Sequence, residues 1–211
     1  MRSWRARWSL LRRKPPFSFL CMAFTATACG PAIVPLRPRV VMTPTAVEAT
    51  DVEYFAANPL MVPVAGVAPD QVRDTFNESR DNGGRLHRAT DILARRGTLV
   101  VSASPGRVLR MAQSKLGGTC MYVQDDNGRF VFYYAHLDRY ASRVEEGAHV
   151  VQGEVLGYVG STGNADPMYP HLHFQAMRRD VNRRDYWNGT PVDVRPFFKL
   201  AGESTRQAQS E

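Results

Sequence analysis

Short apolar segments separated by turn residues fill the middle of this chain of 211 residues. They are rich in β-branched and aromatic residues and are bounded by Gly, Pro, Asn or Asp, a pattern typical of strands. The strongest turn is Asp125-Asp-Asn-Gly128, which predicts a hairpin between two such segments. We see no long amphipathic helix, so we expect a mostly β fold, an antiparallel sheet or sandwich. The expected strands lie at residues 98–103, 107–111, 120–124, 129–134, 150–151, 155–159 and 172–175.

Four regions follow one another along the chain. Residues 1–28 form a predicted signal peptide, and residues 29–59 are rich in proline, as expected of an extended tether. Within the tether, residues 45–57 have the composition of a short helix. The compact domain is expected over residues 60–198, and residues 199–211 form a polar tail.

The N-terminus has the features of a secretory signal peptide. Basic residues up to Lys14 precede an apolar run at residues 17–24, and small residues follow up to Ala28. This ending resembles a bacterial lipoprotein signal, in which Cys29 becomes the lipidated first residue and anchors the protein to a membrane. A signal cut after Ala28 without lipidation and an uncleaved anchor are the alternatives.

The formal net charge of +7 is concentrated in the signal peptide. Without its six basic residues, the chain has 21 basic and 20 acidic residues and is nearly neutral. We therefore expect no nucleic-acid partner, because surfaces that bind nucleic acids carry a clear excess of positive charge. Cys120 is alone once Cys21 is removed and Cys29 is lipidated, so we expect no internal disulfide.

The five histidines are the strongest functional signal. His171 and His173 are two residues apart in a predicted strand, so both side chains point to the same face. His87 and Asp91 form a His-x-x-x-Asp pair, and His136 ends an aromatic strand. Imidazoles and one carboxylate are the usual ligands of a catalytic zinc ion, which keeps one position open for water.

Each of these patterns is weak when it is taken alone. Residues 85–96 also have the pattern of a helix that ends at Gly97, with His87 and Asp91 one turn apart. In that interpretation the two side chains form an ion pair on a helix surface. His149 matches no motif, and we assign it to a solvated loop.

Four motifs occur in one order along the domain. They are Arg85-Leu-His-Arg-Ala-Thr-Asp91, Tyr134-Ala-His-Leu137, Gly157-Tyr-Val-Gly-Ser-Thr-Gly163 and His171-Leu-His-Phe-Gln175. Their types, order and spacing resemble those of the lysostaphin-type (LytM-type) zinc peptidases, which cut peptidoglycan peptides. The resemblance covers roughly residues 60–198 and is specific, because several spaced motifs agree at once.

The resemblance implies a fold, a cofactor and an activity. The fold is the LytM-type antiparallel β domain (duplicated hybrid motif), in which the His-x-x-x-Asp segment is a loop entering a strand; we adopt this over the helix. One zinc ion per chain is bound by His87, Asp91 and His173, while His136 and His171 work beside the metal. The implied activity is hydrolysis of peptide bonds in peptidoglycan, with stem-peptide cross-links as the favoured substrate.

Three residues near these motifs bear on the resemblance. Arg85 matches an arginine that lies near the groove in the family, although a surface ion pair explains it equally well. Ala89 replaces the usual glycine between His87 and Asp91, and Gln175 replaces the usual glutamate. We expect Gln175 to face the same side as the histidines and to orient a ligand imidazole as a neutral acceptor.

These inferences predict an exported zinc metallopeptidase of the cell envelope or periplasm. Anchoring through Cys29 would hold it at a membrane, the outer membrane in a Gram-negative cell. One alternative is a non-hydrolytic LytM-like protein that binds peptidoglycan or activates amidases. Such relatives have lost histidines, whereas none is missing here. The other is a structural lipoprotein with incidental histidines, which does not explain the ordered motifs.

Overall fold

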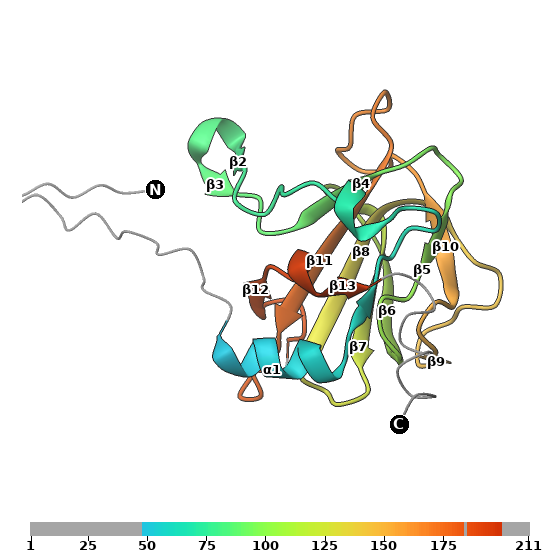
Figure 1. Ribbon diagram of the computed structural model, residues 1–211. Helices are drawn as coiled ribbons and strands as arrows, with labels where there is room; N and C mark the ends of the chain where they lie inside the picture. Colours follow the sequence, from blue (N-terminus) through green and yellow to red (C-terminus); the bar gives the residue numbers. More distant parts are fainter. Residues whose placement is uncertain (1–47, 184, 200–211) are drawn as a thin grey trace, which may run out of the picture. The chain divides into compact units, whose positions relative to one another are not determined.

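The computed structural model describes residues 48–183 and 185–199 (Figure 1). The predicted signal peptide, Cys29 and most of the tether lie outside these residues, as does most of the polar tail.

A sheet of nine strands forms the body of the molecule, and all its pairings are antiparallel. Its main path runs β12-β11-β8-β7-β6-β9, while β10 pairs with β5 and β8, and β4 pairs with β11. This confirms the predicted mostly β fold. The strands are β4 (Thr90–Leu93), β5 (Leu99–Val101), β6 (Gly106–Ser114), β7 (Gly118–Asp125), β8 (Phe130–Tyr140), β9 (His149–Val150), β10 (Val155–Val159), β11 (His171–Arg178) and β12 (Thr190–Val192).

Smaller elements surround this sheet. The strands β1 (Leu60–Met61) and β13 (Phe198–Lys199) form a parallel pair, and β2 (Ser79–Arg80) pairs antiparallel with β3 (Arg85–Leu86). There is one α-helix among the described residues, α1 (Ala49–Ala57), and short 3-10 turns occur at Pro69–Gln71, Asp81–Gly83 and Arg195–Phe197. None of the helices in this part of the chain has the length and apolar character needed to cross a membrane.

The hairpin between β7 and β8 forms at the predicted turn. Gly128 has a φ of +69°, which favours glycine, and its N–H donates to the Asp125 carbonyl. The Asp125 carboxylate also accepts the N–H groups of Arg129 and Phe130. These bonds hold the entry to β8, the strand that carries His136.

The structure agrees with one local expectation and departs from another. Residues 85–96 form β3, a short loop and β4, as the adopted interpretation of a loop entering a strand predicts, and not the helix that their pattern also allows, because β4 pairs with β11. His149 lies in β9 rather than in a loop, although it is exposed, and its Nε2 lies 2.9 Å from Asp126 Oδ1. β9 has two residues, too few to show an alternating pattern.

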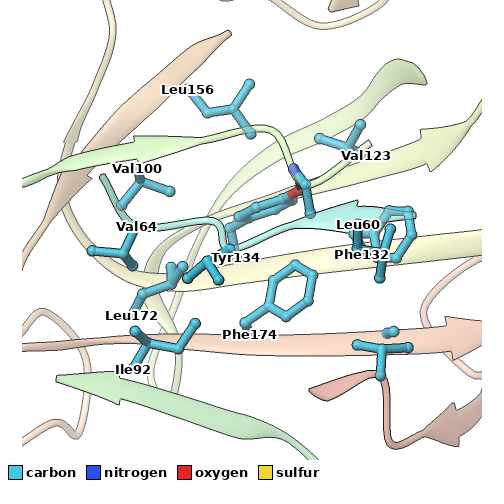
Figure 2. Packing of buried hydrophobic residues seen from close by; sticks show 14 of the residues in the cluster. Leu60, Val64, Ile92, Val100, Val123, Phe132, Tyr134, Leu156, Leu172 and Phe174 are labelled. Atoms are coloured by element: carbon cyan, nitrogen blue, oxygen red, sulfur yellow. Dashed lines mark hydrogen bonds between the residues drawn. The ribbon is translucent and has the colours of Figure 1, made fainter. Parts of the chain in front are cut away.

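Alternation along β11 separates the core from the site. Leu172 and Phe174 are buried in the main hydrophobic cluster, while His171 and His173 point to the opposite face. Figure 2 shows Phe174 beside Tyr134 of β8, and their ring centroids are 5.2 Å apart. The Tyr134 hydroxyl accepts the N–H of Ala103 at 3.0 Å, and burial raises its pKa to about 12. The site therefore rests on a strand pair whose other face is buried in the core.

Helix α1 packs on this body, although we placed its residues in the tether. Phe55 is 1% exposed, and its ring centroid lies 4.5 Å from that of Phe130. Asp51 is fully buried and accepts a hydrogen bond from Arg129 at 2.9 Å. The packed domain thus begins before the expected boundary at residue 60. The helix is too short for its periodicity to reveal which face is buried.

Candidate metal centre

Three side chains from two neighbouring segments converge on one point. His87 follows β3, Asp91 lies in β4 and His173 lies in β11, where Asp91 and His173 are direct partners in the strand register. His87 Nε2 lies 3.1 Å from both Asp91 Oδ1 and His173 Nδ1, and these last two atoms are 3.0 Å apart. The donor atoms form a nearly equilateral triangle.

This triangle fits a zinc ion. Tetrahedral zinc with bonds of about 2.0–2.2 Å places its ligand atoms about 3.3 Å apart, close to the spacing of these donors. Two imidazole nitrogens and one carboxylate oxygen are also the donor types that zinc prefers. His87, Asp91 and His173 can therefore hold the metal without rearrangement of the backbone.

The protonation states of the three side chains also suit a metal. Burial raises the pKa of Asp91, but its hydrogen bonds to His173 and His87 outweigh this and hold the pKa well below its ordinary value. Burial lowers the pKa of His173, which favours its neutral form. His87 Nδ1 lies 2.9 Å from the carbonyl of Thr75, so it is the protonated nitrogen and Nε2 has its lone pair free. Metal ligands must be in these deprotonated forms.

His136 and His171 lie beside the triangle but outside it. The His136 ring centroid is 4.9 Å from that of His171 and 5.6 Å from that of His173. His171 Nε2 is 3.8 Å from Asp91 Oδ1, so this imidazole faces the same centre from a greater distance. Burial lowers the pKa of His136 to about 4, despite its hydrogen bond to Thr162, so its side chain is neutral at pH 7.

Close backbone packing places His136. Its φ of +59° lies in the left-handed region, which histidine adopts more often than most residues. A Cβ at Gly160 would lie 2.4 Å from the Asp138 nitrogen, and one at Gly118 would lie 2.2 Å from Thr162 Oγ1. The glycine-rich motif can therefore lie directly against β8, where the Thr162 carbonyl accepts a hydrogen bond from His136 Nδ1 at 2.8 Å.

An open groove of about 540 Å³ contains the site. The four imidazoles and Asp91 line it together with Tyr133 and Gln175. Leu116, Gly117 and the segment 164–166 also line the groove, as do Arg80, Asp81 and Arg85 of the β2–β3 hairpin. Beyond residues 164–166, this loop turns away from the groove, and Met168 and Tyr169 are largely exposed.

The two residues that we expected near the ligands make other contacts. Arg85 lines the groove, and its Nε donates to Asp81 Oδ2 at 2.6 Å, so it has the surface ion pair that we considered. Gln175 shares the face of the histidines, but its Nε2 donates to the Arg88 carbonyl at 2.9 Å. We expected an acceptor for an imidazole; its amide instead supports the backbone next to His87.

Two further residues at the site have no motif in the sequence. The Thr75 hydroxyl accepts the N–H of Asp91 at 3.0 Å, and the backbone carbonyl of Thr75 orients the His87 imidazole. Arg80 Nη2 donates to Asp91 Oδ2 at 2.8 Å. Both precede the first motif by several residues, so only the folded loop brings them to the ligands.

Comparisons with known proteins agree with this geometry. The model of the family described as Peptidase family M23 matches residues 85–194, more than half of the chain. The L-Ala--D-Glu endopeptidase of Bacillus subtilis is 36% identical over 125 residues, which are 56% of this chain and 37% of that protein. Lysostaphin of Staphylococcus simulans is 36% identical over 122 residues, which are 57% of this chain and 23% of that protein.

Another relative is the peptidoglycan DD-endopeptidase ShyC of Vibrio cholerae, 30% identical over 120 residues, or 57% of this chain and 26% of that protein. Among solved structures, LytU has a TM-score of 0.51 and 30% identity, and the match covers 60% of this chain and 83% of that one. The chain matches between 23% and 37% of the length of these curated relatives. The segment that matches the family model includes all five residues of the site, and the chain belongs to peptidase family M23.

Proposed function

We propose that this protein is a zinc-dependent metalloendopeptidase that hydrolyses peptide bonds in peptidoglycan. The observation that carries this proposal is the triangle of His87, Asp91 and His173 at an open groove, with two more imidazoles beside it. A bound zinc ion supplies Lewis-acid polarisation and lowers the pKa of water toward neutrality. M23 membership and the names of the relatives support the same activity.

In this proposal His136 and His171 move protons. Each has Nδ1 within 2.8 Å of a backbone carbonyl, that of Thr162 for His136 and that of Tyr169 for His171. The Nδ1 atoms therefore carry the protons, and the Nε2 atoms are free to accept one. Peptide hydrolysis needs one proton taken from the attacking water and one given to the leaving amine, and these two Nε2 atoms serve both steps.

The favoured substrates are the stem peptides of peptidoglycan and their cross-links. The names of two relatives specify L-Ala--D-Glu and DD bonds. The groove is open and presents charges of both signs, from Arg80 and Arg85 and from Asp81 and Asp166. A stem peptide is an extended chain that carries free carboxylates, so it fits such a surface.

The direct test is a digest of purified peptidoglycan with the zinc-loaded chain, followed by mass spectrometry of the released fragments. We expect peptide fragments whose masses identify one cleaved bond, and none with the chelator-treated protein. Binding to peptidoglycan or activation of an amidase without any released peptide would instead support the non-hydrolytic alternative.

We also propose that the protein is exported and anchored to a membrane through Cys29. The basic start, the apolar run and the small residues before Cys29 motivate this proposal. Cys29→Ser removes the acylated thiol and should release the protein into the soluble envelope fraction. Cys21→Ser, inside the predicted signal, is the matched control and should leave the protein in the membrane. Equal membrane fractions for C29S and the wild type, with no acyl mass on the wild type, would contradict the anchor.

A further inference from the structure

Arg80 contacts the one oxygen of Asp91 that faces away from the donor triangle. Its Nη2 donates to Asp91 Oδ2 at 2.8 Å, and its Nη1 donates to Glu78 Oε2 at 3.0 Å. The other oxygen, Asp91 Oδ1, is the atom that faces His87 and His173. The two oxygens of the carboxylate therefore have different partners: Oδ2 binds Arg80, and Oδ1 faces the donor triangle.

We propose that Arg80 is a positioning residue that presents Asp91 to the metal through Oδ1 alone. This inference rests on the proposed zinc site. A free carboxylate can rotate and offer either oxygen or both. A charge-assisted hydrogen bond from a guanidinium to Oδ2 opposes that rotation, and such partners typically change metal affinity 10- to 100-fold.

The β2–β3 hairpin couples Arg80 to a second ligand. Glu78 accepts the Arg80 guanidinium through its side chain, and its backbone carbonyl accepts the N–H of His87 at 2.8 Å. The same residue therefore fixes the arginine that holds Asp91 and the backbone that carries His87. A shift of this hairpin would move two ligands together.

Arg85 provides a matched control because it is the cross-strand partner of Arg80 in the hairpin. Both arginines line the groove, and the side chain of Arg85 is 50% exposed against 31% for Arg80. Arg85 pairs with Asp81 and does not touch a ligand in the described contacts. Removal of Arg85 changes the charge of the groove without freeing Asp91.

The test compares Arg80→Met, Arg80→Lys and Arg85→Met in the full chain. Zinc affinity is measured by competition with a chromophoric chelator, and ligand geometry by the visible absorption of the cobalt-substituted protein. We expect R80M to bind zinc 10- to 100-fold more weakly and to have an altered cobalt spectrum. R80K keeps the positive charge and one donor nitrogen, so its zinc affinity should lie between those of R80M and the wild type. R85M should stay within about twofold of the wild type, because no ligand loses a hydrogen bond.

Thermal unfolding of the metal-free proteins shows whether each variant is folded. If R80M is unfolded, R80K provides the comparison, since it retains the charge next to Asp91. Wild-type affinity and an unchanged cobalt spectrum in the folded Arg80 variants would overturn the positioning role. Equal losses in R80M and R85M would also overturn it, because groove charge would then explain both. A wild type that binds no zinc would instead overturn the metal site itself.

Discussion

At the scale of single residues, the site is organised by the backbone carbonyls that orient its imidazoles. Of the four histidines at the site, three have Nδ1 bound to a backbone carbonyl and Nε2 facing the groove. These three are His87, His136 and His171. His173 differs, because its Nδ1 faces the donor triangle. The imidazoles of His87, His136 and His171 therefore have a fixed tautomer, which a metal ligand or a proton-transfer group requires.

His136→Ala separates proton transfer from metal binding. His136 lies outside the donor triangle and is neutral at pH 7, with its pKa lowered to about 4 by burial. We expect zinc content near that of the wild type and a loss of peptidoglycan hydrolysis of about 100- to 10,000-fold. Release of peptides and metal analysis measure the two quantities.

His149→Ala is the control, since this exposed imidazole pairs with Asp126 on the surface. It should hydrolyse peptidoglycan at the wild-type rate. Full activity in H136A would contradict the acid–base role, and loss of zinc in H136A would make His136 a ligand.

Gln175→Glu tests the amide that supports the loop next to His87. Gln175 Nε2 donates to the Arg88 carbonyl, and Arg88 has a φ of +60°. A carboxylate has no donor and would face a carbonyl oxygen, so we expect a loss of about 1–3 kcal/mol in the free energy of unfolding. Urea unfolding of the metal-free protein measures it.

Gln113→Glu is the matched control for this substitution. The Gln113 side chain exchanges hydrogen bonds with the Thr119 hydroxyl, and this hydroxyl can donate to a carboxylate equally well. Q113E should therefore unfold within about 0.5 kcal/mol of the wild type. If Q175E matched the wild type as closely, the contact with Arg88 would have no role in stability.

At the scale of the elements, short-range sequence patterns correctly predicted the structural features that depend on residues close together in the chain. The β7–β8 hairpin follows from Asp125 and Gly128, which set the turn within a few residues. The opposite faces of β11 follow from strict alternation, so the sequence placed His171 and His173 on one side. The helical pattern of residues 85–96 was misleading, because pairing of β4 with β11 overrides local propensity.

The docking of α1 could not be predicted, because distant residues determine it. Phe55 contacts Phe130 and Phe197, and Asp51 pairs with Arg129, all at least 75 residues further along the chain. Nothing within the helix identifies these partners. For the same reason, no local pattern in the sequence indicates that Thr75 and Arg80 belong to the site.

Phe55→Ala tests whether α1 belongs to the folded unit. The phenyl ring is fully buried against the core, so its removal leaves a cavity and should cost about 3–5 kcal/mol of unfolding free energy. Val52→Ala on the same helix is the control: Val52 is 45% exposed, and its loss should cost less than about 0.5 kcal/mol. Urea unfolding compares them. Similar stabilities for F55A and V52A would indicate that α1 contributes little to the domain.

At the scale of the whole molecule, the site joins segments that are far apart in the sequence. His87 and His173 are 86 residues apart, and the pairing of β4 with β11 brings Asp91 directly opposite His173. The motifs revealed the three candidate ligands because each motif is local. Their convergence depends on the fold, which forms the donor triangle only when β4 and β11 are paired.

The stability of the whole domain should therefore depend on zinc. A ligand that binds the folded state but not the unfolded chain stabilises it by about 2.7 kcal/mol at a free concentration of 100 times Kd. For a domain of this size that corresponds to a rise in Tm of roughly 5–10 °C. Calorimetry should show a lower Tm after chelation and its recovery when zinc is added back. Asp91→Ala lacks one of the three donors and should show little response to zinc, whereas His149→Ala should respond like the wild type. A Tm of the wild type that is the same with and without zinc would contradict the assignment of His87, Asp91 and His173 as the metal site, because any tight ligand of the folded state must raise it.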